Sequence, residues 1–414
     1  AQLISAENGY HLWSESWDRT LVDIFTVQEE IAAEVAQRLK VTLLHAAPAA
    51  QETDPVAYAM YLQARHLCRQ QSAESYAQAL LLLGQVLDIA PGYAPAAALQ
   101  ASIYCMQADF ALLAHHEGHA LARQAVARAL ASQPDCAQAL GQLGWVEVQA
   151  DLDFVAATSN YLRALAIDPT DPDLLGQAAN VAMMMGRLDT ASAVLEYLVE
   201  RDPISPNLQC DLGSIHMFAD RYDNAIAHWR TALQLAPGQL ATEARIAMAL
   251  LAKGDAAAAL EASEREREDT FRTEAQAHIY AVAGPQSSAD AMLARLLEYG
   301  EGAALNIVGV LARRGDVDRA FDWLEKALNN HDTGLKYLAV NTRARALHGD
   351  PRWHDFLARL GMSPGQLDAI PFDIRRPDQG DAAGLAVTAG PGIAANPAAA
   401  IPKPGGSATR QAGR

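Results

Sequence analysis

The chain has 414 residues, of which half are apolar and 6% aromatic, and its formal net charge is −17. This length is enough for two or three domains. The acidic net charge argues against a nucleic-acid-binding surface, which requires clustered Lys and Arg. The sequence has no run of about 20 apolar residues, so it predicts no membrane span. The opening residues do not form a signal peptide, and because the chain starts at Ala1 rather than Met, we expect it to be a piece of a longer protein.

The first elements predicted are a β-hairpin and a helix. Asn8-Gly9 lies between two short apolar stretches, and this dipeptide favours a tight hairpin turn because both positions require positive φ. An isolated hairpin is marginally stable, so we expect its partner strands to lie before Ala1. Apolar residues then recur every three or four positions from Ile24 to Leu43, which predicts an amphipathic helix. Residues 46–57 are typical of a linker.

The hairpin and helix carry a set of residues that resembles a known family. The residues concerned are Gln2-Leu3-Ile4, Gly9-Tyr10-His11-Leu12-Trp13-Ser14-Glu15, Asp18-Arg19, Asp23-Ile24-Phe25 and Gln28-Glu29-Glu30-Ile31-Ala32. Together they resemble the end of the TolB-like amino-terminal domain, which in that family precedes tetratricopeptide repeats in bacterial signalling proteins. The resemblance implies that residues 1–45 are the C-terminal remnant of an α/β domain. It also implies that a winged-helix DNA-binding domain or a class III nucleotide cyclase domain lies further upstream.

A repeat of about 34 residues dominates the middle of the chain. Pro134, Pro169, Pro203 and Pro237 are 35, 34 and 34 residues apart, and each closes a similar segment. This period is typical of the tetratricopeptide repeat (TPR), a helix–turn–helix unit that buries its apolar face against its neighbours. The fold class predicted is therefore all-α, a right-handed TPR superhelix of antiparallel helix pairs. We expect about eight pairs over residues 58–361.

The turns within the repeats support the same interpretation. Gly186, Gly254 and Gly315 each follow a predicted first helix, and Asp220 occupies the equivalent place in another repeat. Small residues at the eighth and twentieth positions let the paired helices approach closely. One repeat, which ends at Pro169, has an extra residue in its turn. The interval from Pro91 to Pro134 implies an insertion of about nine residues near 111–118.

The C-terminal part of the chain is expected to cap the array and then lose structure. The sequences AFDWLEKAL at 320–328 and DPRWHDFLARLGM at 350–362 also resemble the ends of TolB-like/TPR proteins. Residues 334–360 would cap the stack with a polar outer face. Residues 362–414 are predicted to be mostly disordered, because from 380 onward they are rich in Ala, Gly and Pro and have few large apolar side chains.

No motif predicts catalytic, cofactor-binding or metal-binding residues. His115-His116-Glu117-Gly118-His119 lacks the Glu directly after the first His that zinc proteases need. Arg314-Gly315-Asp316 is interpreted as an inter-helix turn rather than an adhesion motif. Three turn aspartates, Asp189, Asp223 and Asp318, are expected to cap helix N-termini. The four cysteines form no Cys-x-x-Cys pair and are expected to be buried thiols.

The concave face of the array is the candidate binding site. In this architecture the first helix of each pair lines that face, and its inward positions form a Met- and aromatic-rich stripe. The candidate groove residues are Trp145, Val148, Asn180, Met183, Met184, Ser214, Met217, Phe218, Met248 and Leu251. The stripe has no Lys or Arg among these positions, so we expect an apolar or amphipathic partner segment. The alternative, which the sequence leaves open, is that the superhelix or a preceding domain covers these residues.

The leading functional interpretation is a non-enzymatic protein–protein interaction and regulatory module of a bacterial signalling protein. One alternative is the regulatory half of a class III adenylate/guanylate cyclase, and another is the sensor half of a winged-helix transcription regulator. The residues before Ala1 would discriminate among the three. We expect no cofactor and no nucleic acid partner, a homo-oligomer is compatible with the sequence, and the absence of cysteine pairs favours the cytoplasm.

Overall fold

A computed structural model describes residues 2–4, 11–14, 53–70, 72–109 and 112–378 of the chain. Its first element is a two-stranded antiparallel ladder between β1 (Gln2–Ile4) and β2 (His11–Ser14), in which Leu3 pairs with Trp13. The two strands expected on either side of the Asn8-Gly9 turn are therefore present. The helix predicted over 24–43 and most of the linker lie outside the described residues. Two short strands do not establish an α/β domain.

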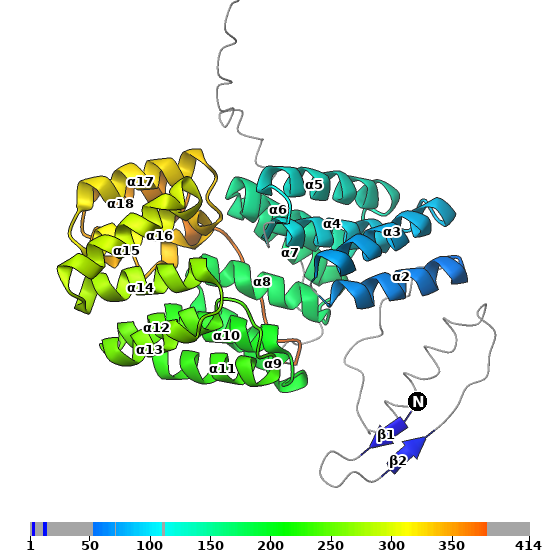
Figure 1. Cartoon of the computed structure of the whole chain (residues 1–414). Coiled ribbons are helices and arrows are strands. Elements are labelled where there is room, and N and C mark those ends of the chain that lie inside the picture. The colour runs from blue at the N-terminus through cyan, green and yellow to red at the C-terminus, as the bar shows by residue number, and fades with distance from the viewer. Residues whose placement is uncertain (1, 5–10, 15–52, 71, 110–111, 379–414) are drawn as a thin grey trace, which may run out of the picture. The chain divides into compact units, whose positions relative to one another are not determined.

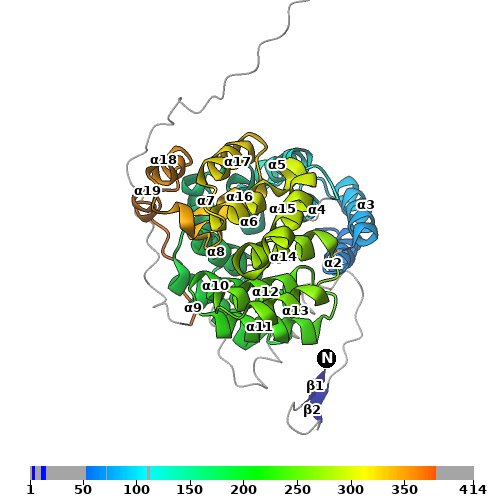
Figure 2. The ribbon, with the colours of Figure 1, turned by 60° about the vertical axis from the view of Figure 1, so that its left-hand side comes forward.

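The rest of the described chain consists of helices stacked in antiparallel pairs (Figures 1 and 2). Eight pairs follow one another within the described residues, which agrees with the expectation of about eight. They are α2 (Pro55–Cys68) with α3 (Ala73–Ile89), α4 (Ala94–Asp109) with α5 (His115–Ser132), α6 (Ala137–Val146) with α7 (Phe154–Ile167), α8 (Pro172–Met184) with α9 (Leu188–Arg201), α10 (Pro206–Phe218) with α11 (Tyr222–Leu235), α12 (Thr242–Ala252) with α13 (Ala256–Arg265), α14 (Asp269–Ala283) with α15 (Gln286–Glu298), and α16 (Ala304–Arg313) with α17 (Val317–Asn329). The described part of the chain is therefore all-α apart from β1 and β2. None of the described helices is long and apolar enough to span a membrane.

Glycines allow the two helices of a pair to approach closely. A Cβ atom at Gly213 of α10 would lie 2.6 Å from Nε1 of Trp229, the buried indole of α11 that donates a hydrogen bond to the Cys210 carbonyl at 3.1 Å. A Cβ atom at Gly144 of α6 would lie 2.9 Å from the ring of Tyr161 in α7. Both glycines occupy the eighth position of their repeats, so the small residue predicted there has the packing role expected of it.

The turns between paired helices also follow the sequence pattern. Gly186, Gly254 and Gly315 adopt φ values of 82°, 88° and 76°, a conformation that glycine tolerates at low cost. Asp220 takes the equivalent position with φ of 57°. Arg314-Gly315-Asp316 lies in such a turn between α16 and α17, which agrees with its interpretation as a turn.

The two irregular repeats accommodate their extra residues within helices. The insertion between Pro91 and Pro134 lengthens α4 to 16 residues and α5 to 18 residues. The extra residue of the next repeat produces η2, a π-helical turn at Glu147–Asp151 that continues α6. A π-turn widens the helix by one residue and is found frequently at functional sites. This one places Gln149 on the inner face of the array.

The expected capping role of three aspartates is wrong. Asp189, Asp223 and Asp318 each occupy the second position of a helix, and none of the three helices has a side-chain cap. From this position a carboxylate points to solvent, so Asp223 pairs with Lys253 and Asp318 with Arg352. In two of these three pairs the side-chain cap lies at the preceding helix instead. Asp171 at α8 and Ser205 at α10 are examples, each followed by a proline at the first helical position.

After α17 the chain forms a segment that folds back onto the middle repeats. It consists of η4 (Thr333–Val340), η5 (Arg345–Leu347), α18 (Pro351–Arg359) and α19 (Pro364–Asp368). Beyond residue 361, the limit predicted for the array, Met362, Leu367, Ile370, Phe372 and Ile374 are buried in the largest core cluster. The predicted boundary is therefore too early, because these five apolar side chains pack in the core despite the small residues that follow them. The prediction for 379–414 lies outside the described residues.

One arginine fixes the end of this segment to the turn between α8 and α9. The Arg187 guanidinium donates hydrogen bonds to the carbonyl oxygens of Phe372 at 2.8 Å, Leu367 at 3.1 Å and Ile370 at 2.5 Å. These contacts join residues that are 180 to 185 positions apart in the sequence, and they place α19 beside the α8–α9 turn (Figure 2). These hydrogen bonds thus help to hold the end of the segment on the middle repeats.

Candidate functional site

The candidate groove residues lie on the first helices of four consecutive pairs, α6 with η2, α8, α10 and α12, as expected. Five of them are buried, namely Val148, Met183, Met184, Met248 and Leu251. The other five, Trp145, Asn180, Ser214, Met217 and Phe218, are half-buried. Only half of the ten candidate residues therefore keep a surface that a partner could reach. That a partner segment binds there remains a prediction.

The chain itself covers part of this stripe. Segment η4 packs against α8 and η2, and the ring of Tyr337 stacks on Phe218 with the ring centroids 6.0 Å apart. The Lys336 ammonium hydrogen-bonds to Gln149 and lies 6.0 Å from the centre of the Trp145 ring. Over this stretch, self-coverage is therefore what the structure shows.

Segment η4 also places a positive charge, that of Lys336, on the inner face, where the candidate groove residues include no Lys or Arg. Lys336 is buried, and this burial lowers its pKa from 10.5 to about 8, although the negative charges of Asp109 and Asp332 oppose the shift. Desolvation raises the pKa of Asp109 on α4, although this residue is exposed in part, while Lys336 acts in the opposite direction. Asp211 on α10 accepts a hydrogen bond from Asn180 at 3.3 Å, and burial raises its pKa as well. The inner face is therefore polar at its centre as well as apolar.

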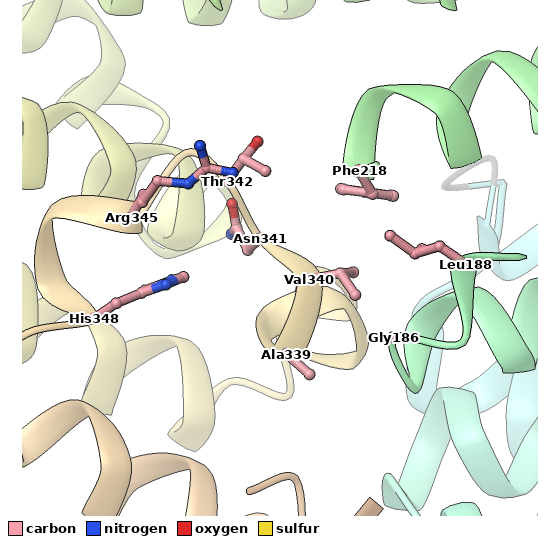
Figure 3. A pocket seen from close by; sticks show the side chains of 9 residues that line it. All are labelled: Gly186, Leu188, Phe218, Ala339, Val340, Asn341, Thr342, Arg345 and His348. Carbon is pink, nitrogen blue, oxygen red and sulfur yellow. The ribbon is translucent and has the colours of Figure 1, made fainter. Parts of the chain in front are cut away.

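A cavity of about 300 Å³ lies where η4 leaves the stripe (Figure 3). Leu188 and Phe218 line it from the side of the repeats, and the C-terminal segment lines it from the other side. The complete lining is Gly186, Leu188, Phe218, Ala339, Val340, Asn341, Thr342, Arg345 and His348. Apolar side chains thus face the cavity from one side and polar groups from the other, an arrangement that can hold one side chain of a ligand.

The polar edge of this cavity has a defined geometry. Arg345 donates hydrogen bonds to both carboxylate oxygens of Asp220, at 3.0 and 3.1 Å. The His348 ring stacks on Trp353 with centroids 4.8 Å apart, and burial lowers the pKa of His348, so the ring is neutral at pH 7. The edge therefore presents hydrogen-bonding groups and one positive charge that is already paired.

Four residues of the inner face or its edge were not among the candidate groove residues, namely Lys336, Gln149, Asp211 and Arg345. Lys336 lies in the run Leu335-Lys336-Tyr337-Leu338, a single cation among apolar residues after the last repeat. Such a run would be unusual in a polar cap. The sequence feature that could have indicated Gln149 is the extra residue of the repeat that ends at Pro169.

The histidine cluster does not form a metal site in the part of the chain that the structure describes. The rings of His115 and His119 lie 6.3 Å apart on α5, but no group of three or more His, Cys, Asp or Glu residues with metal-binding geometry occurs among the described residues. His119 is buried, and this burial lowers its pKa to about 4. Three cysteines are buried as expected, and Cys68 is half-buried.

Comparison with known proteins identifies the repeat. Residues 148–209 match the Tetratricopeptide repeat family. "Putative adenylate cyclase 3" of Rhizobium meliloti (strain 1021) is 38% identical over 100 residues, which are 23% of this chain and 17% of that protein. The chain thus matches less than a fifth of the length of that relative.

Two solved structures show what the array is similar to. PilW, a widely conserved type IV pilus biogenesis factor, is 19% identical with a TM-score of 0.41, covering 58% of this chain and 100% of its own. A thermophilic TPR protein in Thermus thermophilus is 22% identical with a TM-score of 0.38, covering 47% and 99% of the two chains. The 34-residue period, the stacked antiparallel helix pairs and the family match over residues 148–209 together show that the chain contains tetratricopeptide repeats.

Proposed function

We propose that this chain is a non-enzymatic binding module that receives a partner segment at the concave face, with the cavity beside Phe218 as its main anchor point. TPR arrays are consistent with protein–protein interaction, and the carrying observation is the cavity of about 300 Å³ at the edge of the stripe, which has an apolar side at Leu188 and Phe218 and a polar side at Arg345. Because η4 covers the stripe from Trp145 to Phe218, the partner lies along the uncovered edge rather than along the full groove. An apolar partner side chain enters between Leu188 and Phe218.

A selection from a phage-displayed library of random twelve-residue peptides tests this proposal. We expect the chain to enrich peptides that carry a large apolar residue, and Phe218→Ala to weaken their binding by about tenfold or more. Phe271→Ala is the matched control, because Phe271 is also half-buried but lies on α14 outside the cavity lining. No enrichment, or equal binding to the Phe218→Ala protein, would contradict the proposal.

We also propose that the module regulates an output domain upstream, in a TolB-like arrangement. The antiparallel β1–β2 pair supports the resemblance of residues 1–45 to the end of a TolB-like domain. The 38% identity to a protein named as an adenylate cyclase favours a cyclase as that output. In this second candidate function, the present chain is the regulatory half.

The cyclase alternative has a direct test. The gene region upstream of Ala1 is expressed together with this chain, and conversion of ATP and GTP to cyclic nucleotides is measured for the longer and the shorter protein. We expect turnover only in the longer protein, with rates that change when the enriched peptide is added. Turnover by the 414-residue chain alone would contradict the non-enzymatic assignment.

A further inference from the structure

Three arginines meet at the inner end of α16, next to the proposed cavity. They are Arg313, the last residue of α16, and Arg343 and Arg345, which flank the turn between η4 and η5; together we call them the arginine cluster. A Cβ atom at Gly309 of α16 would lie 3.3 Å from Cβ of Arg343 and 2.7 Å from Cε1 of His278 on α14. Helices α14 and α16 and the η4–η5 turn therefore converge at this point.

Two members of the arginine cluster are paired with carboxylates. Arg343 forms an ion pair with Glu274 and lies 3.5 Å from Oδ1 of Asn306. Arg345 donates to both oxygens of Asp220. Arg343 and Arg345 remain partly exposed, with side-chain exposures of 33% and 56%. Partners approaching from solvent can therefore reach the cluster.

The third member is not paired. Within the described residues, Arg313 makes no ion pair, and its buried Nε has no hydrogen-bond partner. His278 beside it is fully buried, and neither of its ring nitrogens has a partner among those residues. Burial and the positive charges of Arg343 and Arg313 hold the pKa of His278 well below its usual range, so the ring is neutral. Unsatisfied buried polar groups of this kind are uncommon in folded proteins and require an explanation.

The charge count of this site indicates which ligand fits it. Three guanidinium groups face two carboxylates, those of Glu274 and Asp220, so one positive charge is left over. This residual charge lies on a chain whose net charge is −17, and that overall charge repels polyanions such as nucleic acid. A single carboxylate matches one residual charge, and guanidinium binds carboxylate through two parallel hydrogen bonds.

We propose that the arginine cluster binds an aspartate or glutamate side chain of the partner segment, whose apolar residue occupies the cavity beside Phe218. This inference rests on the proposed function, since Arg345 lines the cavity and also belongs to the arginine cluster. Arg313 makes the main contact, and Arg343 and Arg345 supply additional positive potential. The module thereby selects acidic, apolar segments over basic ones.

The test uses a peptide enriched from the random library and two versions of it. In the amide version each Glu or Asp is replaced by Gln or Asn, and in the other each is replaced by phosphoserine. Fluorescence polarisation measures the affinities at a fixed ionic strength. We expect the acidic peptide to bind at least tenfold tighter than the amide version, and we expect Arg313→Gln to remove that difference. Arg267→Gln is the matched control, because Arg267 is exposed on the loop before α14, outside the cluster, and loses the same charge.

Two further variants separate charge from folding. Arg313→Lys keeps the charge, so we expect it to retain most of the preference. Arg345→Gln removes an exposed side chain, and we expect it to reduce the preference severalfold. Equal affinities for the acidic and amide peptides, or an unchanged ratio in Arg313→Gln, would overturn the inference while leaving the binding function intact. Tighter binding of the phosphoserine peptide would overturn the carboxylate assignment, and a library that yields no peptide would overturn both proposals.

Discussion

Lys336→Met is expected to stabilise the protein near neutral pH, although it removes a hydrogen bond. The Lys336 ammonium is buried against the inner face, and this burial lowers its pKa from 10.5 to about 8. Keeping the charge buried below pH 8 therefore costs about 3 kcal/mol. The substitution also loses the hydrogen bond to Gln149 and leaves Asp109 without its positive neighbour, which costs about 1–2 kcal/mol. The net gain at pH 7 is about 1–2 kcal/mol.

The pH dependence of the free energy of unfolding provides a second test of this prediction. Because the pKa of Lys336 is lower in the folded state, the unfolded chain binds the extra proton between pH 8 and 10.5. The penalty of the wild-type protein is therefore complete below pH 8 and decreases as the pH rises toward 10.5. Between pH 7 and pH 9.5 the advantage of the methionine variant should shrink by about 2 kcal/mol.

Urea unfolding followed by circular dichroism at pH 7 and pH 9.5 measures both effects. Lys326→Met is the control, because Lys326 is exposed on α17 and lies over the Trp323 ring. Its effect on the free energy of unfolding should be small and the same at both pH values. A Lys336→Met protein that is less stable than wild type by a similar amount at both pH values would refute the reasoning, because burial of the charge would then carry no net cost.

Three further predictions concern packing, acid stability and closure of the array. Gly213→Ala should lower the free energy of unfolding by about 2–3 kcal/mol, as its Cβ would overlap a buried indole, while Gly238→Ala, with no atom within 4 Å, should change it little in the same urea experiment. Burial lowers the pKa of His216 to about 4, so the free energy of unfolding of the wild-type protein should fall by up to about 3 kcal/mol through this group between pH 6.5 and pH 4. The free energy of unfolding of His216→Asn should depend less on pH over this range, and an unchanged pH dependence would contradict the assignment. Arg187→Gln should expose residues near 370 to limited proteolysis, whereas Arg267→Gln should leave the cleavage pattern unchanged; identical digests would show that the guanidinium does not secure the segment.

The repeated part of the fold could be predicted because its determinants are local. A small residue at position 213 and a bulky one at position 229 belong to the same repeat, and the pattern recurs about every 34 residues. The positive-φ glycines at 186, 254 and 315 carry a similar signal, since few other residues adopt that conformation at low cost.

The closure of the inner face could not be predicted, because its determinants are far apart in the sequence. Lys336 meets Gln149, which is 187 residues away, and Arg187 meets the carbonyl of Phe372 across 185 residues. No periodic pattern connects such pairs. The extent of the array was also underestimated at its C-terminal end, because the apolar residues from Met362 to Ile374 are spaced irregularly between polar residues and prolines. The aspartates were misplaced for a simpler reason, since a shift of two positions separates a cap from a solvent-facing carboxylate.

The hydrogen bonds between Arg187 and the C-terminal segment restrict how the number of repeats can change in evolution. In an open solenoid, each repeat touches only its neighbours, so whole repeats can be gained or lost by duplication and deletion with little effect on the others. Here the carbonyls of Leu367, Ile370 and Phe372 must meet one guanidinium on the α8–α9 turn. The number of helix pairs between α9 and α18 is thereby fixed by geometry, since an added or missing pair would move the end of the segment away from its anchor. We therefore expect insertions in related chains to fall within turns, and expansion of the array to occur before α6, because Lys336 also contacts Gln149 on η2.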